Sequence, residues 1–303
     1  MSGKINNMIS LFTNSAYRVE FCVRHGLYNK MQDEKFLKKV FKSRMGYELD
    51  LENPKTYNEK MQWLKLYNRK AEYTMMVDKF KVRDYIEKKI GKEYLIPLLG
   101  VWDNPDDIDF ETLPNQFVLK CNHNSGLGMC ICKDKKKLDI AKVKEELKKG
   151  LRQNYYLIGR EWPYKNVTRK VICEKFMKEE GIDDLRDFKF YCFDGKVKML
   201  GIYSDRNSQC HTKADFFDRD FNWLNLKWGY LNAENPPKKP FKFEEMIKIA
   251  EKLSEDIPVV RVDLYLCGER IYFGELTFFD GSGFDKIEPA EWDLKMGDWI
   301  PKP

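Results

Sequence analysis

Residues 261–285, RVDLYLCGERIYFGELTFFDGSGFD, have the pattern of two strands joined by a tight CGER turn. Arg261 and Asp263 share one face of the first strand, because side chains alternate along a strand. The returning strand carries Glu275, which we expect beside Asp263. Carboxylates placed in this way bind Mg²⁺ together with phosphate oxygens. A structural cross-strand ion pair with Arg261 or Arg270 is the alternative interpretation.

A second informative stretch is FVLKCNHNSGLGMC, residues 117–130. Its apolar start predicts a buried strand, which ends at Lys120 and is followed by a small polar loop. Ser125, Gly126 and Gly128 would let the backbone N–H groups of that loop come close to phosphates, and Lys120 would add a positive charge. The alternative is a lysine on the solvent-facing side of an edge strand.

Two further strands have charges inside apolar runs. In VICEKFMKEEG (171–181), a carboxylate and apolar side chains at the strand end could form an adenine slot, or the strand could simply leave the core. The residues concerned are Glu174, Lys175, Phe176 and Met177. In DFKFYCFDGKV (187–197), Lys189 shares a strand face with Asp187 and Tyr191, which on its own is typical of a solvent-exposed side.

The order of elements predicts an α+β protein. Apolar spacing indicates helices at 33–46, 53–69 and 74–91, and a capping box is expected at Thr56 and Glu59. From about residue 94 the chain is rich in short β segments with hairpin turns, which favours antiparallel pairing. Helices are expected to interrupt these strands at 139–158 and 241–256.

The composition restricts the class of protein. The chain has 303 residues, 43% apolar and 34% charged, with a formal net charge of +6 and no one-sided basic stripe, which argues against nucleic-acid binding. No apolar run approaches the ~18 residues of a membrane helix, and the polar first residues do not resemble a secretion signal. Most cysteines lie in apolar runs. We therefore expect a reduced, cytoplasmic protein.

Taken in this order, the motifs resemble the ATP-grasp superfamily, whose enzymes hold ATP between two α+β subdomains. The segment VDKFKVRDYIEKKIGKEYLIPLLGVW (77–102) extends the resemblance, because it is similar to the superfamily's entry segment. The resemblance implies the ATP-grasp fold: two α+β subdomains with antiparallel sheets clamping a nucleotide, preceded by a helical N-terminal region. The implied boundaries are 1–75 for the helical region, 76–178 for the subdomain with the phosphate flap, and 179–303 for the subdomain with the magnesium site.

The same resemblance implies a role for each candidate residue. Lys79 and Lys120 would contact the nucleotide, the loop containing Ser125, Gly126 and Gly128 would be the mobile flap, and Glu174, Lys175, Phe176 and Met177 would form the adenine hinge. Catalytic roles would fall to Lys189 and Arg261, and the magnesium ligands would be Asp263 and Glu275, with Thr277 nearby. The family often closes with Glu-x-Asn. Thr277 departs from that pattern, so Thr277 or Asp280 is expected at the second metal position, and the number of metal ions is left open.

Within the superfamily, the sequence is most similar to the TupA-like branch, linked to teichuronopeptide and other surface polysaccharides. The segments that carry this resemblance span about residues 50–285 and include NPKTYNEKMQWLKLYNR, FVLKCNHNSG and ELTFFDGSGF. This branch implies an ATP- and Mg²⁺-dependent ligase that joins a carboxylate, such as a uronic acid, to an amine through an acyl phosphate. Candidate substrate contacts are Asn122, His123, Arg186, Asp280 and Ser282, with Arg206 and Lys213 near the cleft.

Two other functions are consistent with parts of the sequence. Asp218 and Asp220 form a D-x-D pattern that in a glycosyltransferase would hold Mn²⁺ under a nucleotide sugar. Aromatic-rich stretches such as FNWLNLKWGY would suit a non-catalytic glycan-binding protein. The first helices are also a candidate for docking on a membrane or a partner, through Arg18, Phe21, Arg24, Leu27 and Lys30.

Overall fold

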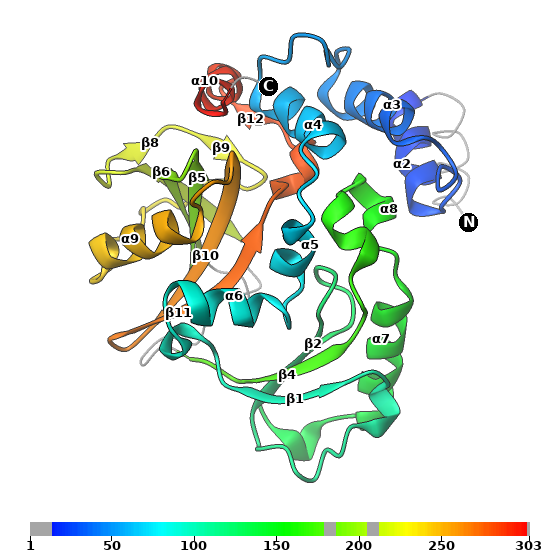
Figure 1. Ribbon diagram of the computed structural model, residues 1–303, viewed down its shortest axis with the longest axis vertical. Coiled ribbons are helices and arrows are strands. Elements are labelled where there is room, and N and C mark those ends of the chain that lie inside the picture. The colour runs from blue at the N-terminus through cyan, green and yellow to red at the C-terminus, as the bar shows by residue number, and fades with distance from the viewer. Residues whose placement is uncertain (1–13, 179–185, 205–211, 302–303) are drawn as a thin grey trace.

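A computed structural model of the chain describes residues 14–178, 186–204 and 212–301. The chain begins with helices and continues into two antiparallel sheets (Figure 1). The first helices are α2 (Ser15–Arg24), α3 (Asp33–Met45), α4 (Tyr57–Tyr67), α5 (Glu72–Val77) and α6 (Val82–Lys89). Short 3₁₀ turns follow along the chain, namely η1 (Lys92–Tyr94), η2 (Pro105–Asp107), η3 (Lys135–Lys137), η4 (Trp162–Asn166) and η5 (Asp280–Gly283).

Local sequence signals place two of these helices as expected. Helix α3 buries its predicted apolar face and ends at Gly46, which has a left-handed φ of 89°. Helix α4 begins with the expected capping box, in which the Thr56 side chain accepts the N–H of Glu59 and the Glu59 carboxylate accepts the N–H of Thr56. The end of α3 and the start of α4 therefore follow from short-range chemistry.

The prediction of one helix over 74–91 was wrong. The chain leaves the helical conformation at Asp78, where φ is −74° and ψ is 107°, and α6 begins four residues later. The carboxylate of Asp78 accepts the N–H of Phe80 at 2.9 Å and the side-chain amide of Asn122 at 2.8 Å. Aspartate competes with the helix by bonding to nearby backbone in this way. The break brings Lys79 next to the loop after β2 (Phe117–Cys121).

The first sheet has four strands in the order β1-β4-β2-β3, all antiparallel. Its other strands are β1 (Leu98–Trp102), β3 (Met129–Cys132) and β4 (Val171–Lys175). Helix α7 (Ile140–Arg152) packs on β2 and β3 (Figure 1). The helix expected over 139–158 ends at Arg152, and a separate short helix, α8 (Tyr156–Gly159), follows.

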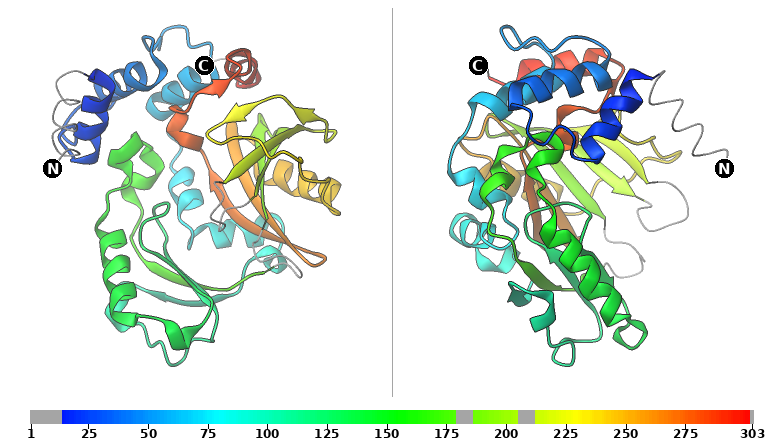
Figure 2. Two further views of the ribbon diagram at one scale, coloured as in Figure 1. Left: turned by 180° about the vertical axis from the view of Figure 1, so that it is seen from behind. Right: turned by 90° about the vertical axis from the view of Figure 1, so that its right-hand side faces the viewer.

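The second sheet has six strands in the order β11-β10-β5-β6-β7-β8. They are β5 (Asp187–Phe193), β6 (Lys196–Ser204), β7 (Lys213–Asp218), β8 (Trp223–Leu224), β10 (Val259–Cys267) and β11 (Arg270–Thr277). Helix α9 (Phe243–Leu253) covers one face, and the largest apolar cluster lies on this sheet. The views in Figure 2 show the two sheets at an angle to one another.

The two ends of the described chain meet at α4. A small pair, β9 (Lys227–Trp228) with β12 (Ile287–Glu288), leads to the last helix, α10 (Glu291–Trp299), which packs on α4. The buried amino group of Lys60 donates to the carbonyl oxygens of Gly297 at 2.9 Å and Ile300 at 3.0 Å. The N–H of Asn58 donates to the Asp293 carboxylate at 3.0 Å. Buried polar groups are thus satisfied across this contact.

Candidate functional site

A cavity of about 570 Å³ lies between the two sheets. Its first wall comes from the four-stranded sheet and the flap, the loop 124–128, with Lys79, Lys120, Cys121, Asn124, Ser125, Gly126, Leu127 and Met129. Its second wall comes from the six-stranded sheet and the segments after it, with Asp187, Lys189, Tyr203, Thr212, Trp228, Gly229, Tyr230, Arg261, Asp263, Tyr265, Glu275, Asp280, Gly281 and Asp285. The fold therefore brings nine of the predicted site residues to one cavity, namely Lys79, Lys120, Ser125, Gly126, Lys189, Arg261, Asp263, Glu275 and Asp280.

Lys120 is held by a carboxylate of the neighbouring strand. Its Nζ lies 2.6 Å from Oε2 of Glu174 on β4, and Arg83 of α6 lies 3.6 Å from the other oxygen of Glu174. Glu174 is buried, so its charge requires such partners. The carboxylate that the sequence suggested for an adenine slot thus contacts the predicted nucleotide lysine in this structure.

Lys79 joins the two walls of the cavity. Its amino group donates to the carbonyl oxygen of Asn124 in the flap at 2.8 Å, and it lies 3.7 Å from the Glu275 carboxylate on β11. Burial lowers the pKa of Lys79, although Glu275 opposes that shift. The amino group of Lys79 therefore contacts the flap on one side of the cavity and lies near a carboxylate of the second sheet on the other.

The centre of the site is a buried cluster of opposite charges on β5, β10 and β11. Asp263 pairs with Glu275 in the β10–β11 register and with Lys189 in the β10–β5 register, which confirms the expected neighbourhood of the two carboxylates. Lys189 donates to Asp187 at 2.7 Å and to Asp263 at 2.6 Å. Arg261 donates to both oxygens of Asp263 at 2.6 and 2.7 Å and to Glu275 at 2.9 Å.

This cluster keeps Glu275 ionised. Burial by itself would raise its pKa, but the nearby charges of Lys79, Arg261 and Lys189 outweigh burial and hold the pKa of Glu275 well below its usual range. The hydroxyl of Thr277 also donates to Glu275 at 2.9 Å. Arg261 additionally donates to the carboxylate of Asp280 in η5, so the loop after β11 belongs to the same charge network.

The oxygen atoms at the centre of the site are of the kind that bind a hard cation. Asp263, Glu275 and the hydroxyl of Thr277 offer oxygen atoms only, which is the chemistry that Mg²⁺ prefers. Within residues 14–178, 186–204 and 212–301, however, no group of three or more His, Cys, Asp or Glu side chains is arranged to hold a metal ion. Such a site would need further oxygens from a ligand, as the phosphates of a nucleotide would provide.

The flap depends on glycine for its conformation. Gly126 and Gly128 both have left-handed φ values, 80° and 70°. A Cβ on Gly128 would meet Sγ of Cys121 and Cα of Gly150 at 2.8 Å, whereas a Cβ on Gly126 would meet nothing within 4 Å. Ser125, Gly126 and Leu127 are exposed. Gly128 therefore anchors the flap against α7, while its tip is open to the cavity.

Other predicted site residues lie outside the cavity lining. The side chain of Asn122 bonds to Asp78 and to the backbone, and His123 contacts the carbonyl oxygen of Gln153 at 3.0 Å. Lys175 is the last residue of β4 and is followed by Phe176 and Met177, and Arg186 precedes β5 with its guanidinium 5.9 Å from the Phe188 ring. Ser282 bonds to Glu161. Arg206 lies outside the described residues.

Sequence reasoning missed a buried polar network that holds the Asp280 loop. Lys65 of α4 is fully buried and donates to the carbonyl oxygens of Ser282 and Gly159, both at 2.7 Å, and to the side chain of Gln62 at 3.0 Å. Gln62 donates to the carbonyl oxygen of Gly283 at 2.7 Å. Burial lowers the pKa of Lys65 to about 7, although the charge of Glu161 opposes this shift.

The far end of the cavity was also missed. Tyr203, Trp228, Tyr230 and Asp285 line it beyond Asp280. For Trp228 and Tyr230 the signal was the aromatic richness of FNWLNLKWGY, which does not distinguish a cavity wall from an ordinary core. Trp228 is indeed buried, and Tyr230 is partly exposed.

Asp218 of the D-x-D pattern lies in a turn. One of its carboxylate oxygens accepts the N–H groups of Asp220 at 2.9 Å and Asn222 at 2.8 Å, and the other accepts the Asn222 side chain at 2.9 Å. Neither Asp218 nor Asp220 lines the cavity between the sheets. These bonds are those of an Asx turn that closes β7, so Asp218 has a structural role here.

None of the helices within the described part of the chain has the length and apolar character to cross a membrane. The first helices carry exposed Arg24 and Leu27, and Phe21 stacks on His25 with ring centres 3.9 Å apart. The predicted docking surface there keeps its mixed basic and apolar character.

Comparison of the sequence with known protein families gives a match over most of the chain. The sequence model of the family described as TupA-like ATPgrasp matches residues 59–301. Among solved structures, D-alanine–D-alanine ligase from Bacillus anthracis in complex with ATP matches with a TM-score of 0.43 and 16% identity, covering 67% of this chain and 55% of the ligase. This chain thus spans little more than half the length of that ligase.

Two further structures give similar matches. D-Alanine–D-alanine ligase from Helicobacter pylori has a TM-score of 0.42 and 15% identity, covering 80% of this chain and 69% of the ligase. D-Alanyl-alanine synthetase A from Vibrio cholerae has a TM-score of 0.42 and 13% identity, covering 80% of this chain and 64% of the synthetase. No curated protein sequence matches the chain.

Proposed function

The chain belongs to the TupA-like ATP-grasp family, and we propose that it is an ATP- and Mg²⁺-dependent ligase that joins a carboxylate to an amine. The observation that supports this most directly is the cavity in which Lys79 and Lys120 face Arg261, Asp263 and Glu275. The lysines of one wall can bind phosphates, and the carboxylates and the arginine of the other wall can bind Mg²⁺ and phosphate oxygens. A magnesium–triphosphate ligand requires both kinds of group.

Each group has a role in this proposal. Lys79, Lys120 and the backbone of the flap bind the phosphates, and the end of β4, with Glu174, Lys175, Phe176 and Met177, borders the adenine. Asp263 and Glu275, with Thr277 beside them, would hold magnesium, which when bound supplies positive charge to the phosphate oxygens. ATP binding would exchange the present ion pairs of Lys120 and Arg261 for phosphate contacts.

The reaction then proceeds by two substitutions. A substrate carboxylate attacks the γ-phosphorus, the bond to the β-phosphate oxygen breaks, and ADP leaves. The amine attacks the acyl carbon of the resulting acyl phosphate, loses a proton and expels phosphate, which leaves an amide. Arg261 and Lys189 balance the negative charge that spreads over the transferring group. No protein nucleophile takes part.

The proposed substrates are those that the resemblance to the TupA-like branch implies. The proposed carboxylate is a uronic acid or a similar acid of a surface polysaccharide, and the proposed amine is an amino acid or amino sugar. Arg186 near β5 and Asp280 in the cavity are the proposed substrate contacts. The reaction is placed in the cytoplasm, where ATP is available, with the α2 region as a candidate contact to the membrane surface.

The deciding experiment is nucleotide binding, measured by calorimetry and thermal shift with Mg·ATP and with nucleotide sugars plus Mn²⁺. We expect wild type to bind Mg·ATP and Lys120→Met to bind it about 100-fold more weakly, because one charge-assisted contact is lost. Lys198→Met is the matched control, since Lys198 is an exposed residue of β6 outside the cavity. Binding of a nucleotide sugar but not of ATP would exclude the ligase proposal.

A further inference from the structure

One carboxylate in the cavity between the sheets has no cation beside it. The described residues that line this cavity include five carboxylates and four basic side chains. They are Asp187, Asp263, Glu275, Asp280 and Asp285 on the one hand, and Lys79, Lys120, Lys189 and Arg261 on the other. Each of the first four carboxylates forms an ion pair with Lys189 or Arg261. Within residues 14–178, 186–204 and 212–301, the Asp285 side chain has neither an ion-pair partner nor a hydrogen bond.

Asp285 is held in place by its backbone and by the turn before it. The side-chain amide of Asn58 donates to the carbonyl oxygen of Asp285 at 3.1 Å. The carboxylate of Asp285 lies against Gly281, where an added Cβ would collide with it, and Gly281 has a left-handed φ of 55°. The unpaired carboxylate therefore lies at the cavity wall, directly beside the turn η5 that carries Asp280.

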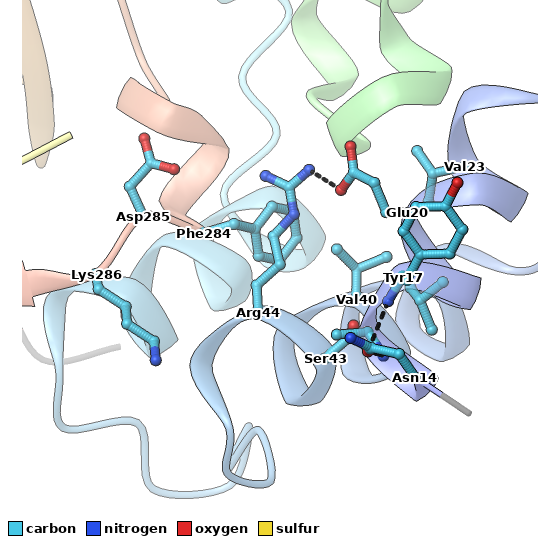
Figure 3. Close-up of a pocket in the computed structure, with 12 residues that line it drawn as sticks. Asn14, Tyr17, Glu20, Val23, Val40, Ser43, Arg44, Phe284, Asp285 and Lys286 are labelled. Carbon is cyan, nitrogen blue, oxygen red and sulfur yellow. Dashed lines mark hydrogen bonds and ion pairs between the residues drawn. The ribbon is translucent and has the colours of Figure 1, made fainter. Parts of the chain in front are cut away.

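Two basic residues near Asp285 in the chain or in space are directed elsewhere. Figure 3 shows the side chains of Asp285 and Lys286 on opposite sides of the chain. The guanidinium of Arg44 donates to Glu20 at 3.0 Å. The charge of Arg44 lowers the pKa of Asp285, but burial and the charge of Asp280 outweigh it and raise that pKa. A positive charge brought by a ligand would therefore stabilise the ionised carboxylate.

Asp285 also lies close to where the second step of the proposed reaction takes place. The acyl phosphate would form beside Arg261, which bonds to Asp280, and the Asp285 carboxylate packs on the residue that follows Asp280. Tyr230 lines the same part of the cavity and has 46% of its surface exposed. A carboxylate next to an accessible aromatic ring is a favourable environment for an ammonium group.

We propose that Asp285 binds the ammonium group of the amine substrate, and that this contact makes the ligase select an amine over a hydroxyl compound. The inference rests on the proposed function and assigns the residue that recognises the second substrate. A protonated amine supplies the positive charge that the cavity lacks at this position. A hydroxyl group in the same place would leave the carboxylate without a charged partner, and its hydrogen bond would be weaker.

The test is calorimetry of small amines with the protein in the presence of Mg²⁺ and a non-hydrolysable ATP analogue. The probes are glucosamine and glycinamide, at a pH of about 6.5, below the usual pKa of an α-amino group. Their neutral counterparts are glucose and glycolamide, in which a hydroxyl group replaces the amino group. We expect wild type to bind at least one amine about tenfold or more tightly than its counterpart.

In Asp285→Asn this ratio of affinities should fall to near one, because the substitution removes the charge and keeps the shape of the side chain. Asp220→Asn is the matched control: it makes the same change of charge at an exposed carboxylate outside the cavity, and the ratio should stay as in wild type. The ratio separates recognition from a structural effect, since a distorted cavity would weaken the amine and its counterpart alike.

Three results would overturn the inference: equal affinity of wild type for the amines and their counterparts, no binding of either amine, or an unchanged ratio in Asp285→Asn. The comparison in wild type needs no variant, so it decides even if thermal unfolding shows that Asp285→Asn is not folded. The nucleotide analogue is titrated in the same samples. Failure of wild type to bind it would contradict the ligase proposal, whereas analogue binding without a preference for amines would contradict only the role of Asp285.

Discussion

The amino nitrogen of Lys65 lies 2.7 Å from the carbonyl oxygen of Ser282, although 217 positions separate the two residues along the chain. The same nitrogen donates to the carbonyl oxygen of Gly159 at the end of α8, between α7 and β4. One side chain of α4 therefore fixes η5, the turn that carries Asp280 into the proposed active site. The helical N-terminal region thus contributes to the geometry of the site without lining it.

Replacement of Lys65 by Met should destabilise the protein by about 3 kcal/mol, because it leaves buried carbonyl oxygens without a donor. Urea denaturation measures this difference. Lys148→Met is the control: within the described residues Lys148 forms exposed ion pairs with Asp106 and Glu145, so its loss should leave stability close to that of wild type. An equal loss of stability in the two variants would show that the Lys65 network stabilises the protein no more than an exposed ion pair does.

Gly283→Ala should cost about 3 kcal/mol and reduce phosphate release in the ligase assay. Gly283 has a φ of 60°, and a Cβ there would meet the Cβ of Met61 at 2.6 Å and Nε2 of Gln62 at 2.7 Å, so overpacking adds to backbone strain. Gly268→Ala separates the two causes, since Gly268 has a φ of 59° and open space around it. The control should lose only about 1 kcal/mol, and equal losses would contradict the packing argument.

Stability should rise with pH over the range below about 6.5, the usual pKa of histidine, and His123 should contribute to that rise. Burial lowers the pKa of His123 in the folded protein, and the charges of Arg169 and Lys79 act in the same direction, with Asp78 opposing them. The unfolded chain therefore binds a proton there that the folded chain does not, and lowering the pH favours unfolding.

The measurement is urea denaturation at several pH values between about 5 and 8, a range centred on the usual pKa of histidine. His123→Gln should flatten the profile below about pH 6.5, because Gln does not titrate there. His25→Gln, at an exposed histidine, is the control and should keep the wild-type slope. An unchanged slope in His123→Gln would mean that other groups cause the pH dependence.

The two acidic motifs should differ in their effect on activity. Asp263→Asn should lower ATP-dependent phosphate release by about 100-fold or more, since Asp263 positions both Arg261 and Lys189. Asp220→Ala should leave the rate within about twofold of wild type, because Asp220 lies outside the cavity. The opposite ranking would favour the glycosyltransferase interpretation.

Much of the fold could be predicted from the sequence, because local patterns determined it. Alternation and the turn residues identified the hairpin of β10 and β11, whereas the pairing of Asp263 with Glu275 also depends on a register shift between Asp263 and Leu264. The break at Asp78 was not predictable in the same way, since the apolar spacing continues through it and its cause is the contact with Asn122, far along the chain. Strands β7, β8, β9 and β12 were missed because their strand conformation depends on pairing with neighbouring strands and not on a pattern in their own sequence.

The same distinction between local patterns and long-range contacts holds for the site. The predicted phosphate and metal residues Lys79, Lys120, Arg261, Asp263 and Glu275 follow strand ends and turns, and they reach one cavity. The sequence could not show that Glu174 pairs with Lys120, or that Lys65 supports the Asp280 loop, because both are long-range contacts between side chains. Lysine in an amphipathic helix normally indicates a solvated face, and Lys65 is an exception that only tertiary packing creates.

The contact of Lys60 with Gly297 and Ile300 has a consequence for the order of events during synthesis. Helix α4 emerges from the ribosome well before these partners, because Gly297 lies 237 positions after Lys60. Until then Lys60 lacks these two acceptors and α10 does not yet cover α4, so the nascent chain is expected to need a chaperone over that interval. The proposed active site would therefore form only when translation has passed residue 300, and a ribosome-bound intermediate would not consume ATP.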